Sequence, residues 1–397
     1  MIARIRRQYN DTFTNEAYQA MLSWMGGQYG AQPKFHVAET PVFFSREFRD
    51  KVFEACAHVI ERVTDPEYVQ RAQPAIPPGE QVPGQTDRPL FLQLDFGVCQ
   101  GAESGELEPQ LIEVQGFPSL YFFQALLDRS FRKFFTVPEG YSARFDGSSA
   151  EEYLDLLRRV ILAGHPPENV ILLEVDPKGQ TTRIDFVVAC AELGISEVCI
   201  SEIVREERKI YYRKGDELIE VKRIFNRVIF DELKARTDLP RQFNLIEEAD
   251  VEWAGHPNWF FLISKYSLPF LDSPYVPDSY FLSDLENYPA DLENFVLKPL
   301  YSFAGMGVNL RPTPEDLRAV THPEHYILQR KVSYAPVVET PDGPAKVELR
   351  MMYLWPPDAD RPVLVNNLVR LSKGEMIGVR YNKGKTWVGG SLGYFQE

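Results

Sequence analysis

The stretch Phe295-Val-Leu-Lys-Pro-Leu-Tyr-Ser-Phe-Ala-Gly-Met-Gly307 carries the strongest indication of the fold in this 397-residue chain. A short apolar run ends at Lys298 and then breaks into a turn of small residues. A lysine at the end of a strand is a fixed positive charge, and Gly305 and Gly307 let backbone N–H groups approach phosphate oxygens without a Cβ in the way. The order suits a lysine and a loop that cover a polyphosphate. Strands that end in Lys-Pro before a glycine turn also occur in ordinary surface hairpins, so this stretch alone leaves both interpretations open.

Composition narrows the possible partners. The chain is 44% hydrophobic and 25% charged, and it is long enough for two or three packed domains. A formal net charge of −14 argues against a nucleic-acid or anionic-membrane partner, because either needs a basic face. The four cysteines lie far apart without C-x-x-C spacing, which favours reduced core thiols. No apolar stretch approaches the roughly 20 residues of a membrane span, so we expect a cytoplasmic protein.

The first 164 residues predict a helical part and a β-hairpin. Apolar residues at helical spacing predict a helix over 45–64, and five prolines between polar residues make 72–89 a loop. Two β-like runs follow, at 90–97 and 110–115, with an acidic, glycine-containing connection between them.

Residues 165–240 predict an inserted α/β subdomain, and residues 241–397 an α+β half. The subdomain begins with a βαβ unit and ends with a hairpin. Its elements are expected at 170–175, 182–193, 196–200, 209–213 and 218–225. The α+β half has strands expected at 295–298, 326–332, 347–355, 363–371 and 386–388, with a helix at 314–321.

A possible metal site lies on the first hairpin. Glu113 and Gln115 are two residues apart on one strand and therefore share a face, which Asp95 joins if the two strands pair. Two carboxylates and an amide oxygen are hard ligands suited to magnesium that bridges nucleotide phosphates. A solvated antiparallel face with polar groups at alternate positions would give the same pattern.

A set of cations follows or interrupts apolar β-like runs in the second half of the chain. Strand-end placement of positive charge suits anion binding, although each cation singly also fits a surface position. The set comprises Lys265, Lys298, Arg350 with its neighbour Glu348, Arg370 and Lys373.

In this order the segments resemble an ATP-grasp ligase. The resemblance runs through Lys265, Lys298, the glycine turn, a hydrophobic hinge at Tyr326–Lys331, Val347–Arg350 and Val369–Lys373. The candidate metal hairpin lies before these segments instead of after the hinge, so the resemblance is to the circularly permuted branch that holds eukaryotic glutathione synthetase and bacterial glutathionylspermidine synthetase. There an Asp-aromatic pair precedes Glu-x-Asn, as in Asp95-Phe96 and Glu113-Val-Gln115.

Further segments extend the resemblance, and some positions depart from it. Gly116-Phe-Pro-Ser119 is similar to the continuation in glutathionylspermidine synthetase, and Lys222–Arg227 to a strand that leads to an arginine. Gln93 stands where the family has an arginine, Ser302 where it has a glutamate, and Gln115 where it has an asparagine. Losing a positive charge and a carboxylate weakens charge stabilisation, which puts activity in more doubt than nucleotide binding.

The resemblance implies a set of roles. Magnesium would be held by Asp95, Glu113 and Gln115, and ATP phosphates by Lys265 and Lys298. The loop residues Ser302, Gly305 and Gly307 would cover the phosphates. The hinge Ile327–Gln329, with Lys331, would lie against adenine. The substrate carboxylate or the transferring phosphoryl group would be bound by Arg350, Arg370 and Lys373.

The function that the resemblance implies is an ATP-dependent carboxylate–amine ligase acting through an acyl phosphate on an amino-acid or peptide-like carboxylate. Arg223 and Arg227 in the subdomain are the expected selectors of substrate, and a homodimer is expected because dimers are common in the superfamily. Three alternatives stay open: a regulatory or sensor nucleotide-binding protein of the same fold, a small-molecule kinase, and an ordinary α/β protein that binds no nucleotide.

Overall fold

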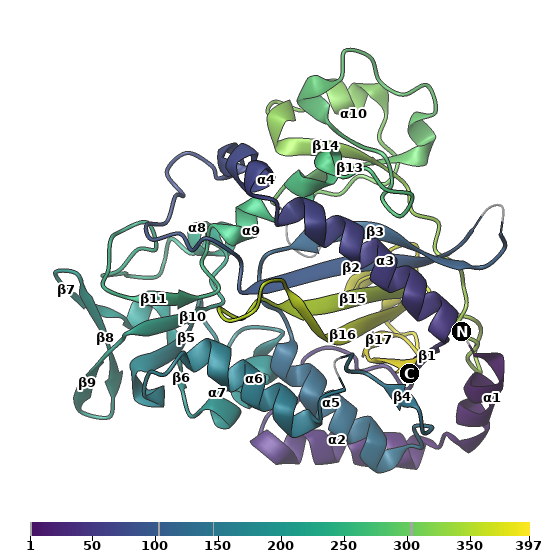
Figure 1. Cartoon of the computed structure of the whole chain (residues 1–397), viewed down its shortest axis with the longest axis horizontal. Coiled ribbons are helices and arrows are strands. Elements are labelled where there is room, and N and C mark those ends of the chain that lie inside the picture. The colour runs from purple at the N-terminus through teal and green to yellow at the C-terminus, as the bar shows by residue number, and fades with distance from the viewer. Residues whose placement is uncertain (1, 102–103, 146, 302–304) are drawn as a thin grey trace.

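A five-stranded antiparallel sheet occupies the centre of the molecule (Figure 1). The computed structural model describes residues 2–101, 104–145, 147–301 and 305–397, and it has a mixed α+β architecture. The central sheet has the order β17-β16-β15-β2-β3. Its strands are β2 (Phe91–Gln100), β3 (Leu107–Gln115), β15 (Lys346–Leu354), β16 (Val363–Ser372) and β17 (Gly389–Ser391).

The predicted first hairpin is confirmed. β2 and β3 pair antiparallel with Asp95 opposite Glu113, and both strands are longer than the sequence indicated. β2 is buried along nearly its whole length because β3 and β15 flank it. It is therefore an interior strand whose polar residues must find partners inside the protein.

Helices cover both sides of the central sheet (Figure 1). The helix predicted at 45–64 is α3 (Arg46–Val63), and its N-cap Ser45 accepts a hydrogen bond from the Phe48 amide at 3.4 Å. Its apolar face packs on β3, while α2 (Asn15–Tyr29) packs against α5 (Tyr121–Phe134).

A parallel sheet with the order β11-β10-β5-β6 contains the strands of the predicted βαβ unit. Its strands are β5 (Val170–Glu174), β6 (Ser196–Cys199), β10 (Arg223–Asn226) and β11 (Glu252–Ala254). The predicted βαβ unit is confirmed, with α7 (Arg183–Leu193) as its helix. The sheet extends past residue 240 to β11, and the limits 165–240 stay a prediction.

The prediction of one hairpin strand over 218–225 is wrong. β9 (Glu217–Glu220) pairs with β8 (Lys209–Lys214), whereas β10 lies in the parallel sheet. The apolar residues Ile224 and Phe225 explain the difference, because β10 is covered on both faces and paired on both edges between β5 and β11.

A small antiparallel sheet with its own apolar cluster lies beyond one end of the central sheet, at the top of Figure 1. Its order is β12-β14-β13, with β12 (Ser279–Phe281), β13 (Phe295–Pro299) and β14 (Tyr326–Arg330). Helix α10 (Pro314–Arg318) follows the N-cap Thr313 and ends earlier than the predicted 321.

Segments from both ends of the chain meet in a further sheet, in which β18 (Gly393–Gln396) lies between β1 (Val42–Phe44) and β4 (Tyr141–Ser142). The prediction of a strand at 386–388 is wrong. Trp387 has a left-handed φ of 60° and donates its amide to Glu39, so a strand begins only at Gly389.

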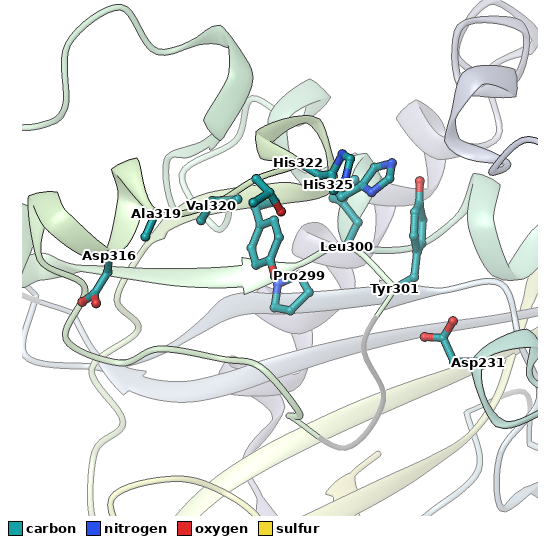
Figure 2. A pocket seen from close by; sticks show the side chains of 11 residues that line it. Asp231, Pro299, Leu300, Tyr301, Asp316, Ala319, Val320, His322 and His325 are labelled. Atoms are coloured by element: carbon teal, nitrogen blue, oxygen red, sulfur yellow. The ribbon is translucent and has the colours of Figure 1, made fainter. Parts of the chain in front are cut away.

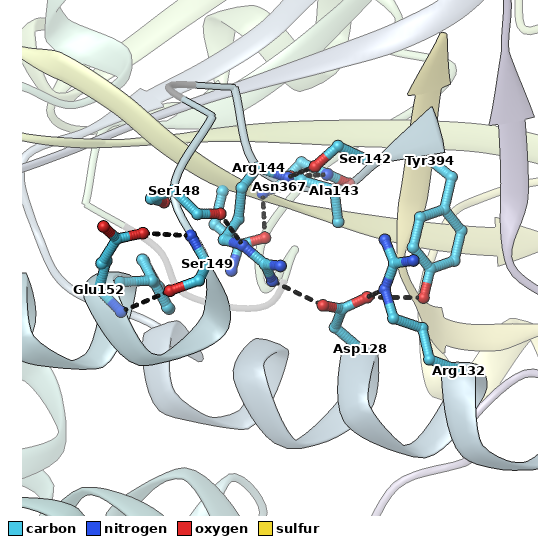
Figure 3. Close-up of polar contacts among 12 residues, drawn as sticks. Asp128, Arg132, Ser142, Ala143, Arg144, Ser148, Ser149, Glu152, Asn367 and Tyr394 are labelled. Atoms are coloured by element: carbon cyan, nitrogen blue, oxygen red, sulfur yellow. Dashed lines mark hydrogen bonds and ion pairs between the residues drawn. The ribbon is translucent and has the colours of Figure 1, made fainter. Parts of the chain in front are cut away.

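A buried carboxylate joins the sheet of β1, β18 and β4 to α5 (Figure 3). Asp128 accepts hydrogen bonds from the Tyr394 hydroxyl at 2.8 Å and from Arg144 at 2.6 Å. Asn367 on β16 donates to two backbone carbonyls beside them, at 2.9 Å each. These bonds join the segment that contains Asp128 and Arg144 to β16 and β18, which lie more than 200 residues later in the chain.

The remaining elements frame these sheets. They are α1 (Ala3–Thr12), α4 (Pro66–Arg71), α6 (Ala150–Leu162), α8 (Phe230–Ala235), α9 (Trp259–Leu262) and β7 (Val204–Glu206). All four cysteines are free thiols, as predicted. Among the described residues, no helix combines the length and apolar character needed to cross a bilayer.

Candidate functional site

Strand register brings the predicted charged residues to adjacent positions on the central sheet. Asp95 on β2 lies opposite Glu113 on β3 and opposite Arg350 on β15. Glu348, two residues before Arg350, lies opposite Arg370 on β16. The two-residue period of a strand therefore gathers these side chains on one face, where we call them the charge cluster.

Asp95 and Arg350 form the centre of the charge cluster. The Arg350 Nε and Nη2 atoms each donate to one Asp95 oxygen, both at 2.6 Å, which is bidentate geometry. Its Nη1 donates to the Gln93 side-chain oxygen at 3.0 Å. Arg350 is 7% exposed and Asp95 is 1% exposed. Arg350, predicted to hold a substrate group, is instead engaged by these internal partners.

Arg370 and Glu348 form the outer part of the charge cluster. The Arg370 Nη2 donates to Asp95 at 3.0 Å and to Glu348, and the Tyr334 hydroxyl donates to the other Glu348 oxygen at 3.0 Å. Burial raises the pKa of Glu348 even though Arg370 favours its ionised form. The Arg370 side chain is 38% exposed, so it borders solvent.

Two lysines meet at the other end of the charge cluster. The Lys265 Nζ lies 2.9 Å from a Glu113 oxygen. The Lys298 Nζ donates to the Ile112 carbonyl at 3.4 Å and to the Gln329 side-chain oxygen. Burial lowers the pKa of Lys298 to about 8, against the attraction of Glu113. Burial also opposes ionisation of Glu113, but Lys265, Lys298 and Arg350 outweigh it and hold its pKa below the usual range.

Lys265 reaches this position from a different element than predicted. It begins a 3-10 helix over Lys265–Phe270, and the apolar run before it forms α9, so no strand ends at Lys265. Ser264 explains the break, because its hydroxyl accepts a hydrogen bond from the Tyr266 amide at 3.1 Å and caps the new helix.

The described part of the glycine turn after β13 begins at Gly305, and the approach of its backbone to phosphate oxygens stays a prediction. Gly305 and Gly307 have φ values of 73° and 72°, in the left-handed region that glycine favours. A Cβ on Gly307 would lie 2.8 Å from the Pro299 Cγ, so the turn also needs the missing side chain for space. Ser302, predicted to lie in this loop, falls outside the described residues.

The hinge strand β14 offers no free backbone edge over Ile327–Gln329. It pairs with β12 on one side and with β13 on the other, so the predicted backbone contacts to adenine are not available there. The Gln329 side chain remains at the site, where its buried Nε2 has no hydrogen-bond partner among the described residues.

Two predicted residues lie apart from the charge cluster. Lys331 donates to the Glu293 carbonyl and lines a separate 750 Å³ cavity. Lys373 binds Asp342 and donates to the Thr386 carbonyl at 3.1 Å. The structure therefore does not bring Lys331 and Lys373 to the lysines or to Arg370.

The predicted metal ligands lie side by side, but their surroundings do not fit magnesium. The Gln115 Nε2 faces Asp95 at 3.4 Å and Glu113 at 3.3 Å, so its amide donates toward the carboxylates. Each oxygen of both carboxylates already accepts a side-chain hydrogen bond. No group of three or more His, Cys, Asp or Glu side chains arranged for a metal occurs among the described residues.

A buried arginine lies at the carboxyl end of β10, next to the charge cluster. Arg227 is 5% exposed, and its Nε and Nη1 have no hydrogen-bond partner among the described residues. Its guanidinium lies 4.8 Å from the Phe117 ring centre and 5.3 Å from that of Phe186. Burial lowers the Arg227 pKa and the charge of Arg350 adds to the effect, so the two arginines are within electrostatic range.

Two acidic groups accompany Arg227. Burial raises the pKa of Glu174, at the end of β5, to about 8 despite the nearby arginine. Asp185 accepts hydrogen bonds from the Phe122 and Phe123 amides at 2.9 and 2.8 Å and so caps the start of α5. Glu174 accepts a hydrogen bond from the Val175 amide at 2.7 Å, so both acids have structural partners, whereas the Arg227 guanidinium has unused donors.

Arg223, the other predicted selector, has a structural environment. Its Nε and Nη2 donate to the Ile161 and Val160 carbonyls at 2.8 and 3.1 Å, at the end of α6. Its Nη1 binds Glu252 at 2.7 Å. These bonds satisfy carbonyls at the end of α6. The Arg223 guanidinium is therefore not available to bind a substrate beside Arg227.

Two members of the site have roles that the sequence did not predict: Gln93 was named only as a departure from the family's arginine, and Tyr334 was not named. Gln93 is fully buried, accepts from Arg350 and donates to the Ser119 carbonyl at 2.9 Å. Its place two residues before Asp95 on the same strand was a usable signal. Tyr334, which binds Glu348, lies outside the named strands and had no such signal.

A 520 Å³ cavity opens between the end of β13, the α10 region and Asp231 of α8 (Figure 2). Tyr301 and the stacked rings of His322 and His325, 5.7 Å apart, line it. Burial raises the Asp231 pKa, and Lys265 is among the cations that oppose this effect. Pro299, which directly follows Lys298 on β13, also lines the cavity, so the cavity lies beside the lysine end of the site.

Comparison with known proteins identifies a similar fold. No family model and no curated protein matches the sequence. Among solved structures, the chain is similar to a glutathione synthetase-like effector, GSS30, from Globodera pallida in its apo form, with a TM-score of 0.58 and 11% sequence identity. The alignment covers 96% of each chain. At this identity the likeness shows the fold alone, which is glutathione synthetase-like.

Proposed function

We propose that the protein binds ATP, with its phosphates on Lys265 and Lys298, as a nucleotide-binding protein of a circularly permuted ATP-grasp-like fold. The observation that carries this proposal is that Lys265 and Lys298 come from different elements and meet beside Glu113, with Lys298 on the strand that leads into the glycine turn. The chain order supports the permutation, because the β2–β3 hairpin precedes the lysine strand β13.

The burial and the hydrogen-bond partners of Lys298 favour binding of an anionic ligand. Among the described residues, its ammonium donates only to neutral oxygens, those of Ile112 and Gln329. Burial of this charge without a directly bonded anion is unfavourable, as the lowered pKa indicates. A phosphate beside Lys298 would supply the missing countercharge.

The test is a calorimetric titration with a non-hydrolysable ATP analogue. We expect micromolar binding by the parent protein and at least tenfold weaker binding by Lys298→Met. Lys331→Met is the matched control, because Lys331 extends from the same small sheet but binds the Glu293 carbonyl; its affinity should stay within twofold. Absence of heat with the parent protein, or equal losses in both variants, would contradict the proposal.

A second candidate, the ATP-dependent carboxylate–amine ligase, is favoured by Arg227. Two unused N–H groups on a buried guanidinium suit a substrate carboxylate, such as that of an amino acid or peptide. In that reaction an oxygen of this substrate carboxylate attacks the γ-phosphorus of ATP, and ADP leaves. An amine then attacks the acyl carbon, and phosphate leaves with the former acyl oxygen.

The two candidates are distinguished by turnover. A screen of amino acids, peptides and polyamines should release ADP only if the ligase candidate is correct. Arg227→Met should then raise the KM for the carboxylate substrate while nucleotide affinity stays unchanged. Nucleotide binding without ADP release from any pair would leave the regulatory or sensor function as the conclusion.

A further inference from the structure

We propose that Arg350 and Arg370 take the place of a divalent cation in the charge cluster, so that the nucleotide binds without a metal ion. This inference rests on the proposed nucleotide function and specifies its cofactor requirement. It is carried by the hydrogen-bond partners of three carboxylates, those of Asp95, Glu113 and Glu348.

Every oxygen of these carboxylates has a donor within the protein. Asp95 accepts from Arg350 on both oxygens, and from Arg370 on one of them. Glu348 accepts from Arg370 and from Tyr334. Glu113 is paired with Lys265 at 2.9 Å, and its other oxygen accepts from Gln115. A magnesium ion would need oxygens that these donors already use.

The Arg350 guanidinium is also held from the side away from Asp95. Its Nη1 donates to Gln93 at 3.0 Å, and the Gln93 amide donates to the Ser119 carbonyl at 2.9 Å. Moving Arg350 aside would therefore break a bidentate ion pair and leave the Gln93 oxygen unpaired, in a region where both residues are buried. A metal ion does not displace such a group without a large cost.

The charge balance of the cluster agrees with direct anion binding. Four cations, those of Lys265, Lys298, Arg350 and Arg370, stand against three carboxylates. The charge cluster together with the two lysines therefore has a net positive charge, although the whole chain has a net charge of −14. Arg370 is the partly exposed cation, and it provides a donor surface at the edge of the cluster.

The first measurement compares titrations of a non-hydrolysable ATP analogue in excess Mg²⁺ and in EDTA. We expect affinities within twofold of one another. A loss of tenfold or more in EDTA would overturn the inference while supporting the proposed function. Absence of binding in both conditions would count against the proposed function, and a Mn²⁺ titration then tests the inference separately.

The second measurement follows Mn²⁺ binding by electron paramagnetic resonance without nucleotide. We expect no binding below millimolar Mn²⁺ in the parent protein, and acquired Mn²⁺ binding in Arg350→Met/Arg370→Met, because removal of both arginines frees the carboxylates. Arg330→Met is the control, because Arg330 pairs with Asp278 and Asp291 outside the cluster.

Each outcome of the Mn²⁺ experiment decides the question. Tight Mn²⁺ binding by the parent protein would overturn the inference, and so would a folded double variant that binds no Mn²⁺. If circular dichroism shows that the double variant is unfolded, the parent titrations with Mn²⁺ and with the ATP analogue still provide the test.

Discussion

Removal of either partner of the Asp95–Arg350 pair should destabilise the protein far more than removal of both. Both side chains are buried, and two 2.6 Å bonds join them. Breaking such a pair from one side leaves an uncompensated buried charge and costs about 3–5 kcal/mol. We therefore expect this loss for Asp95→Leu and for Arg350→Met, with Arg370 restoring little because it is partly exposed.

The double variant Asp95→Leu/Arg350→Met should stay within about 1 kcal/mol of the parent protein, well above either single variant in stability, because apolar residues then fill the site without a stranded charge. Urea denaturation followed by circular dichroism measures the free energies of unfolding. Arg159 and Asp358 provide the matched control, because they form a two-bond pair at 2.9 and 2.8 Å on the surface. Their variants should lose at most about 1 kcal/mol. Equal losses for the buried and exposed pairs, or additive losses at the buried pair, would refute the reasoning.

Three further predictions concern single residues. Burial lowers the pKa of Lys298 to about 8, so its charge is present below and lost above that pH; calorimetry should show nucleotide affinity falling between pH 7 and 9 in the parent protein but not in Lys298→Met. Glu174, with its pKa raised to about 8, keeps its proton in the folded state at pH values where the unfolded state has released it. Stability should therefore fall as pH rises from about 4.5 to 8, by at most about 1.4 kcal/mol per pH unit, and urea midpoints of Glu174→Gln should lack this decline. Gly307→Ala should cost about 1–2 kcal/mol from its left-handed φ and more from contact with Pro299, whereas Gly305→Ala has the strain without so close a contact; a larger loss at Gly305, measured by urea midpoints, would contradict this ranking.

Strand periodicity made much of the central sheet predictable. The runs at 90–97, 110–115, 347–355 and 363–371 all lie in strands, because apolar and polar residues alternate strongly enough to fix their faces. The shared face of Asp95 and Glu113 followed from that alternation together with strand pairing. A two-residue period therefore predicted the core of the site.

Pairing partners were not predictable in the same way. Arg350 was assigned to a ligand because the sequence does not state that β15 lies beside β2, which places Asp95 opposite it. Lys265 follows an aromatic run that fits a strand or a helix, and the cap at Ser264 decided between them. Lys331 and Lys373 resembled site cations by spacing, but backbone carbonyls and Asp342 bind them elsewhere. Apart from the local cap at Ser264, these misses concern contacts with other segments of the chain.

The pairing of β2 with β15 has a consequence for synthesis of the chain. Asp95 precedes its partner Arg350 by 255 residues, so a ribosome releases β2 long before β15 exists. Until then, one edge of an apolar strand lacks its neighbour and the carboxylate lacks its guanidinium. An incomplete chain would therefore present both an aggregation-prone edge and an unneutralised acid, which a holdase chaperone or a protease can recognise. Pairing of β15 with β2 removes both features, so the charge cluster can form only after synthesis has passed β15.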